Sequence, residues 1–272
     1  IFDSPNAVLA TADGILVADP AAGNIRRIAP DGNIATLLDA SSGIRTPAGM
    51  AADGEGNLYV ADQQSGAVFK FTPGGELTTV APEGSFTSPA GLASDAAGNL
   101  YVADMGGHFI RKVGRDGTIS IVAGTGKAGY NGDGRPGPSA QIDRPYGLAL
   151  DAAGNLYFTE AGGHRVRKLA PSGVIYTAAG AGRPGFSGDG GPAAAAQLDS
   201  PSGIAVDAER NLYVADSGNL RLRKISPSGG IATVEGIALP PAATLFSLSG
   251  DGRIYIADPV AGCVRVLAPV TR

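Results

Sequence analysis

The sequence predicts an all-β fold, a six-bladed β-propeller built from four-stranded repeats. Three observations lead to this prediction: one segment recurs along the whole chain, its apolar stretches are too short for helices, and the copies number six. The strong copies are residues 46–71, 88–113, 144–169 and 200–225, and two weaker copies occupy residues 4–28 and 242–267. Short strands that repeat radially form the blades of a propeller.

Length and composition restrict what the chain can be. The 272 residues show no change of composition along their length, so we expect one domain spanning residues 1–272. The net charge of −4 argues against nucleic acid as a partner, because nucleic-acid binding needs a basic surface. The single cysteine, Cys263, excludes an intrachain disulfide bond and a cysteine-based zinc site. No apolar run approaches the roughly 20 residues of a membrane-spanning helix.

Each repeat contains four expected strands in the same order. The first follows a Pro-x-Gly, as in residues 147–151, and a polar turn leads to the second, as in residues 156–159. The third follows a turn of small residues, as in residues 165–169, and the fourth lies at residues 174–178. We expect this chain order to be the order from the propeller axis outward.

The second and third strands differ in polarity. Residues 100–103 and 212–215 do not alternate with polar residues, which predicts that both faces of the second strand are buried between neighbouring blades. Arginines alternate with apolar residues in two of the third strands: Arg165, Arg167, Arg221 and Arg223. We therefore expect the third strands to lie nearer the outer edge, with one face in water.

The carboxylates that end the second strands give the number of blades. They are Asp19, Asp62, Asp104, Glu160, Asp216 and Asp258. Their separations are 43, 42, 56, 56 and 42 residues, which predicts blades at about residues 4–45, 46–87, 88–143, 144–199, 200–241 and 242–272. The two longer steps carry insertions at the same point, after the fourth strand and before the next Pro-x-Gly.

The repeated pattern resembles the NHL-repeat family of β-propellers, as found in bacterial NHL repeat-containing proteins. The pattern joins Pro-x-Gly to Asp-x-x-Gly-Asn-Leu-Tyr-Val-Ala-Asp, followed by Arg-Lys in the third strand, and it is strongest over residues 46–225. The resemblance implies the propeller fold. It is less specific for function, because the family includes extracellular sensor domains, interaction modules of multidomain proteins and some metal-dependent lyases.

The last blade differs from the others. An uninserted connection from one third strand to the next repeat, such as residues 72–87, has 16 residues, whereas residues 268–272 and 1–3 together have only 8. Eight residues suffice for turns but not for a fourth strand. We expect a three-stranded sixth blade, or a chain that has been shortened, with an exposed edge strand near residues 263–267 where another chain could pair.

The insertions, residues 124–143 and 180–199, are the most distinctive segments. Each contains an aromatic residue, a Gly-Asp-Gly and an Ala-rich run that could form a helical turn. The candidate binding residues are Tyr130, Asp133, Phe186 and Asp189. Three readings stay open: a loop whose aromatic covers the blade, a ligand or partner surface, and an Asp-based calcium site with few oxygen ligands. A phosphate-binding loop is not indicated, because no Gly-Lys-Ser/Thr follows.

The insertions, the six carboxylates and two histidines should share one face of the propeller. The carboxylates either form an acidic ring for a cation or accept hydrogen bonds from backbone N–H groups of their own turns, and the identical contexts favour the second. His108 and His164 occupy equivalent positions, with Asn219 as the counterpart one blade later. With Glu160 they could hold a metal, but the resemblance implies a packing role for this histidine.

The residue between Pro and Gly varies among the repeats. It is Ala48, Ala90, Tyr146 and Ser202 in the strong copies, and Asn6 and Thr244 in the weak ones. Tyr146 is large, and Arg144 stands where other copies have Ser or Thr. An aromatic ring and a guanidinium group at the channel mouth are a candidate recognition patch. Alternatively, Tyr146 plugs the channel.

We therefore expect a non-catalytic recognition or scaffold propeller that binds a protein, peptide or glycan on the insertion face. It would be a monomeric surface or sensor domain, extracytoplasmic, with no cofactor and no metal. The alternative is a metal-dependent lyase or lactonase-like enzyme acting at the central channel; a purely structural spacer is the third. Against an enzyme, the expected inner strands offer almost no ligating side chains at residues 50–52, 92–94, 148–150 and 204–206.

Overall fold

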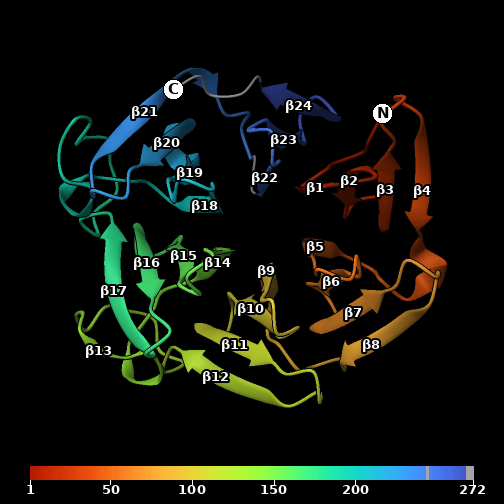
Figure 1. The fold of residues 1–272 in the computed structure, drawn as a ribbon, viewed down its shortest axis with the longest axis horizontal. Helices are drawn as coiled ribbons and strands as arrows, with labels where there is room; N and C mark the ends of the chain where they lie inside the picture. Colours follow the sequence, from red (N-terminus) through yellow and green to blue (C-terminus); the bar gives the residue numbers. More distant parts are fainter. Residues whose placement is uncertain (243–244, 268–272) are drawn as a thin grey trace.

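The computed structural model describes residues 1–242 and 245–267, which form a ring of six antiparallel sheets around a central axis (Figure 1). Each sheet is one blade. The only helices in the described residues are four 3-10 turns: η1 (Ala40–Ser42), η2 (Gly137–Ser139), η3 (Ala193–Ala195) and η4 (Ser217–Asn219). None of them has the length or the apolar character to span a membrane. The predicted all-β propeller is confirmed.

The first three blades have four strands each, and neighbours in the chain pair with one another. Blade 1 contains β1 (Ala7–Thr11), β2 (Gly14–Asp19), β3 (Asn24–Ile28) and β4 (Ile34–Leu38). Blade 2 contains β5 (Pro47–Ala52), β6 (Leu58–Asp62), β7 (Ala67–Phe71) and β8 (Leu77–Ala81). Blade 3 contains β9 (Pro89–Ser94), β10 (Leu100–Asp104), β11 (Phe109–Val113) and β12 (Ile119–Ala123). The first strand of each blade lies nearest the axis, as predicted (Figure 1).

The last three blades differ in strand number. Blade 4 contains β14 (Pro145–Leu150), β15 (Leu156–Glu160), β16 (Arg165–Leu169) and β17 (Val174–Ala179). Blade 5 contains β18 (Pro201–Val206), β19 (Leu212–Asp216), β20 (Arg221–Ile225) and β21 (Ile231–Ala238). Within the described residues, blade 6 has three strands, β22 (Phe246–Leu248), β23 (Ile254–Asp258) and β24 (Cys263–Leu267). This matches the prediction of a three-stranded sixth blade.

The first insertion adds a strand that the sequence analysis did not predict. β13 (Arg135–Pro136) pairs with β17 and becomes a fifth, outermost strand of blade 4. The turns η2 and η3 lie in the Ala-rich runs where helical turns were expected. Each insertion therefore reaches forward along the chain and lies on the outer part of the following blade.

The hydrophobic core is divided among the interfaces between neighbouring blades. One cluster joins Ala103 and Ile110 of blade 3 to Leu148, Leu156 and Phe158 of blade 4. All five residues of β6 and all five of β19 are buried, as predicted for second strands that are enclosed on both faces. Burial of these apolar strands is the main force that holds blade against blade.

The ring closes between blades 6 and 1 through the N-terminal segment. The amide of Phe2 donates a hydrogen bond to the carbonyl of Gly262, at the turn between β23 and β24, over 3.0 Å. The Phe2 side chain is buried with Val8, Val17 and Ala257. In the described residues β24 pairs only with β23, and Val266 in this strand is 56% exposed.

Candidate functional site

The six carboxylates at the ends of the second strands organise the face that carries the insertions. All six are buried. Asp62 accepts hydrogen bonds from the amides of Gln64 and Ser65 in its own turn, as predicted, and also from Arg45 and Thr46, which precede the inner strand of the same blade. Asp19 and Asp104 likewise accept two bonds from the loops before their inner strands, and Glu160 and Asp216 accept one each, from the amides of Asp143 and Asp199. Each of these carboxylates therefore fixes the loop that leads into its inner strand.

Two buried arginines connect the insertions to this framework. In blade 4, Arg167 places Nη1 3.3 Å from Oε2 of Glu160 and Nη2 2.9 Å from Oδ1 of Asp133. In blade 5, Arg223 makes the same contacts with Asp216 at 3.2 Å and Asp189 at 2.7 Å. A buried guanidinium with two carboxylate partners keeps its charge compensated.

We predicted that one face of the third strands would be exposed to water. For Arg167 and Arg223 this prediction is wrong. The Arg167 and Arg223 side chains have no exposed area, because each insertion lies over the third strand of the blade that follows it. The Gly-Asp-Gly loops supply the covering carboxylates, and Asp133 also accepts hydrogen bonds from Thr177 in β17. Sequence reasoning missed this pairing because Asp133 and Arg167 are 34 residues apart.

The insertion aromatics form two equivalent surfaces, which we call the aromatic platforms. The Tyr130 ring centroid lies 4.0 Å from the guanidinium carbon of Arg165, and the Phe186 centroid lies 4.1 Å from that of Arg221. Tyr130 and Phe186 are nevertheless 43% and 41% exposed. Stacking on arginine holds each ring in place while its outer face stays in water.

Burial changes the acidity of the carboxyls beneath the platforms. Burial raises the pKa of Glu160 to about 7, against the lowering effect of Arg167 and of the Asp143 amide. Burial also raises the pKa of Asp216. Burial raises the pKa of Asp189 as well, but the hydrogen bond from Thr233 and the nearby Arg223 outweigh it and leave that pKa below its usual value.

The two histidines tie consecutive blades together. Nδ1 of His108 accepts a hydrogen bond from the amide of Arg144 over 3.1 Å, and Nδ1 of His164 accepts one from Ser200 over 3.1 Å. Both residues have left-handed backbones, with φ of 55° and 50°. The counterpart in blade 5 is Leu220, with φ of 53°, and not Asn219 as the sequence analysis proposed. No group of three or more His, Cys, Asp and Glu side chains in the described residues is arranged to hold a metal.

The remaining predicted site residues lie where the chain enters β14. Arg144 is exposed, has a left-handed backbone with φ of 49° and places Nε 3.8 Å from Oδ1 of Asp143. Tyr146 is half-buried, and neither residue lines the central cavity. The six predicted residues thus fall into three places: a platform with Tyr130 and Asp133, a second with Phe186 and Asp189, and the Arg144–Tyr146 segment.

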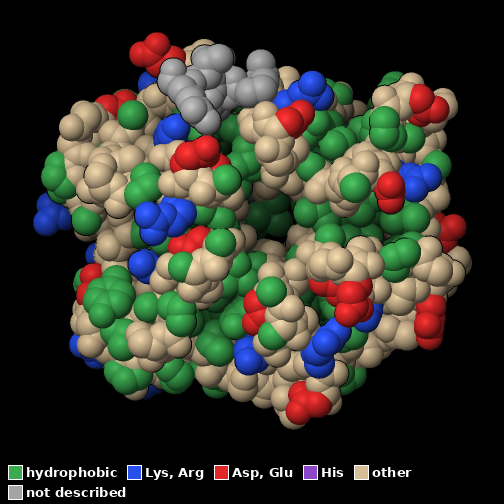
Figure 2. All heavy atoms as spheres, in the orientation of Figure 1, with side chains coloured by type: hydrophobic (Ala, Val, Ile, Leu, Met, Phe, Trp, Pro, Cys, Tyr) green, Lys and Arg blue, Asp and Glu red, His purple; other side chains and the backbone are tan. Residues whose placement is uncertain are grey.

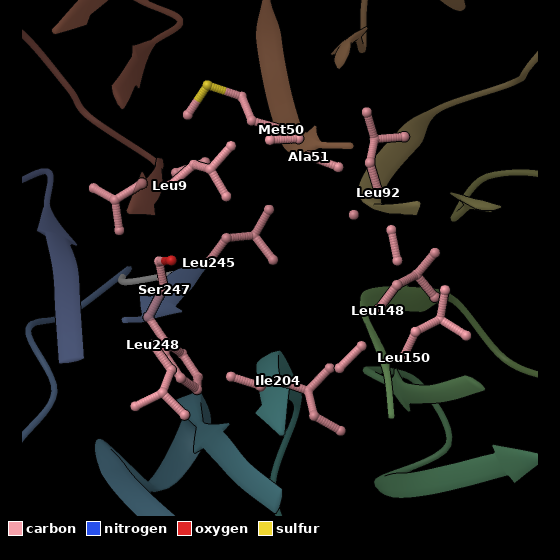
Figure 3. Close-up of a pocket in the computed structure, with 18 of the residues that line it drawn as sticks. Leu9, Met50, Ala51, Leu92, Leu148, Leu150, Ile204, Leu245, Ser247 and Leu248 are labelled. Atoms are coloured by element: carbon pink, nitrogen blue, oxygen red, sulfur yellow. The ribbon is translucent and has the colours of Figure 1, made fainter. Parts of the chain in front are cut away.

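The central cavity, of about 330 Å³, has aliphatic walls (Figure 3). Side chains from the inner strands, among them Met50, Leu148 and Ile204, point into it (Figure 3). Its polar side chains are used internally: Ser94 Oγ donates to the carbonyl of Ala52 over 2.7 Å, and Ser247 Oγ accepts from the amide of Ala10 over 3.0 Å. The cavity is visible as a hydrophobic hollow in one face of the ring (Figure 2). Its described walls contain no carboxylate, imidazole or thiol.

Known proteins resemble this chain in sequence and in fold. The NHL repeat family model matches residues 198–225. Protein SUPPRESSOR OF QUENCHING 1, chloroplastic, of Arabidopsis thaliana is 33% identical over 95 residues, which is 35% of this chain and 9% of that protein. This chain therefore spans a small part of that relative.

Two solved structures show the same fold at low sequence identity. An auxiliary nutrient binding protein from Bacteroides thetaiotaomicron VPI-5482 aligns with a TM-score of 0.77 and 11% identity over 98% of this chain and 69% of its own. Virginiamycin B lyase from Staphylococcus aureus aligns with a TM-score of 0.64 and 16% identity over 99% of this chain and 85% of its own. At such identities the likeness concerns the fold, because unrelated functions share propeller scaffolds.

Proposed function

We propose that this chain, an NHL-repeat β-propeller, is a non-catalytic recognition or scaffold domain that binds a protein, peptide or glycan on its insertion face. The observation that carries the proposal is the pair of aromatic platforms. Both rings are exposed, both are stacked on arginine, and both stand on the same framework of buried charges in adjacent blades.

Rigid aromatic side chains suit recognition. A ring that is already held by arginine loses little conformational entropy when a ligand covers it. Aromatic and arginine side chains also dominate the binding energy of protein interfaces. Because there are two platforms in neighbouring blades, we expect a ligand that contacts both rings, and not a small ligand that contacts only one.

The alternative of a lyase or lactonase at the channel has less support from the residues. The channel walls are aliphatic, and the two serines are engaged in internal hydrogen bonds. We therefore place recognition on the insertion face and not in the channel. An extracytoplasmic surface or sensor role and a monomeric state are parts of the same proposal.

The platforms can be tested with arrays of glycans and of peptides. We expect a ligand of the wild-type protein to bind the double variant Tyr130→Ser/Phe186→Ser about tenfold more weakly or worse, because each ring is a buried anchor in the complex. Tyr176→Ser is the matched control, since Tyr176 is an aromatic of similar exposure, 45%, on the outer strand β17. Array ligands that bind wild type and double variant equally, or no array ligand at all, would contradict the proposal.

A further inference from the structure

The groove between blades 1 and 2 is much larger than the equivalent groove between blades 2 and 3. The first has a volume of about 430 Å³ and is lined by Leu16, Arg27 and Leu37 of blade 1 and by Leu58, Phe71 and Pro73 of blade 2. The second has a volume of about 110 Å³. The residues that line the second groove stand at the repeat positions that correspond to the six residues named for the first. In the same order they are Tyr59, Lys70, Val80, Leu100, Val113 and Arg115.

Two replacements open the larger groove. Between blades 2 and 3, the Tyr59 hydroxyl donates to Asp53 over 3.0 Å, and Lys70 lies over the Tyr59 ring at 5.9 Å. Arg115 also fills this groove and pairs with Glu55 at 2.7 Å. Between blades 1 and 2, Leu16 takes the place of the tyrosine and Pro73 takes the place of the arginine, so the space stays open.

The opened groove contains two free charges of opposite sign. Arg27 is paired across the sheet with Leu16, so it lacks the aromatic partner that Lys70 has. Asp13 lies in the short turn between β1 and β2. Both side chains are exposed, and in the described part of the chain neither makes an ion pair or a side-chain hydrogen bond. Asp53 also lines the groove, but its oxygens accept bonds from Glu55, Asn57 and Tyr59.

The groove is a suitable size and shape for a small molecule. Its volume falls in the usual range for ligand pockets, and its floor is apolar with a few polar groups at the rim. It adjoins the central cavity, because Ala52 lines both. Hydrophobic side chains extend from the central hollow toward the side of the ring where Figure 1 places blades 1 and 2 (Figure 2).

We propose that this groove binds an apolar α-amino acid. The Arg27 guanidinium holds the ligand carboxylate, since its planar fork matches a carboxylate in geometry and charge. The Asp13 carboxylate accepts hydrogen bonds from the ligand ammonium group. The ligand side chain lies against Leu16 and Phe71. This binding site is separate from the insertion face, so it does not depend on the recognition role proposed above.

The protein contains no tryptophan, which makes L-tryptophan a clean fluorescent probe. We expect its fluorescence anisotropy to rise saturably when the protein is added and L-leucine to compete for the site. Tryptamine lacks the carboxylate and N-acetyl-L-tryptophan lacks the ammonium group. We expect each to bind about tenfold more weakly or worse, because each loses one charge-assisted contact.

Three variants locate the site. Leu16→Tyr restores the residue found in the neighbouring blades and fills the groove, so we expect it to abolish binding of L-tryptophan. Arg27→Gln should weaken binding about tenfold or more. Lys70→Gln, at the equivalent position of blade 2, should leave binding unchanged. Unfolding curves confirm that each variant is folded.

Several results would overturn the proposal. One is the absence of saturable binding by both L-tryptophan and L-leucine. Another is unchanged affinity in Leu16→Tyr, which would place the probe elsewhere on the protein. Equal affinity for L-tryptophan and tryptamine would show that Arg27 does not select a carboxylate.

Discussion

The Glu160–Arg167–Asp133 cluster shows how single residues anchor a long insertion. Burying the Arg167 guanidinium is costly unless its charge is compensated, and two carboxylates from different parts of the chain supply that compensation. The same cluster recurs as Asp216, Arg223 and Asp189. Each insertion is therefore attached to the following blade through a buried arginine of that blade's third strand.

The raised pKa of Glu160 predicts a pH-dependent stability. Because burial raises this pKa from 4.5 to about 7, the folded protein binds the Glu160 proton more tightly than the unfolded chain. The stability that this proton contributes is fully present below about pH 4.5 and is lost as the pH rises through about 7. We expect the free energy of unfolding of wild type, relative to Glu160→Gln, to fall by up to about 3 kcal/mol across this range.

Urea unfolding at several pH values measures this difference. Asp216→Asn is the matched comparison, because Asp216 occupies the equivalent position in blade 5 and burial raises its pKa as well. A difference between wild type and Glu160→Gln that is constant with pH would show that Glu160 stays ionised beside Arg167.

At the scale of elements, the Pro-x-Gly motif lets the inner strands approach one another closely. A Cβ atom on Gly49 would lie 1.9 Å from the carbonyl oxygen of Ala90 in the next blade. The corresponding distances are 2.4 Å from Gly91 to Tyr146 and 2.4 Å from Gly147 to Ser202. A larger residue would clash with the backbone of the next blade, and a backbone cannot move aside as a side chain could. Glycine is therefore required at these positions.

Substitution of these glycines should separate the inner strands. We expect Gly49→Ala to lower the free energy of unfolding by about 1–3 kcal/mol or more, because the added methyl group overlaps a carbonyl of β9. Gly54→Ala is the control, since nothing lies within 4 Å of its added Cβ. Denaturant unfolding of the two variants makes the comparison, and equal stability of Gly49→Ala and wild type would refute the steric explanation.

At the scale of the whole molecule, the sequence predicted those features that repeat and missed those that depend on distant contacts. The second strands, the blade number and the three strands that blade 6 has within the described residues follow from spacing and apolar runs within each repeat. The burial of Arg167 does not, because its cover comes from an insertion attached to the previous blade. The groove at Leu16 was not predicted for another reason. Blade 1 is a weak copy of the repeat, and the residues that depart from the repeat pattern are among those that leave the groove open.

In the described residues, blades 6 and 1 meet in a seam of non-covalent contacts around Phe2. Phe2 occupies the place that Phe86 has between blades 2 and 3, since the Phe86 amide donates to Gly66 as that of Phe2 donates to Gly262. Every other junction in the ring combines such contacts with a continuous chain. The seam and this internal junction are therefore equivalent in this contact, in which a buried phenylalanine bonds to the turn of the preceding blade.

This equivalence makes the protein a candidate for circular permutation. If the original ends are joined by a Gly/Ser linker and the chain is reopened between Glu83 and Gly84, both exposed, the new seam falls between blades 2 and 3. We expect the permuted chain to fold with a free energy of unfolding close to that of wild type, measured by urea unfolding. A permuted chain that does not fold would show that the order in which the blades are made matters as well as their contacts.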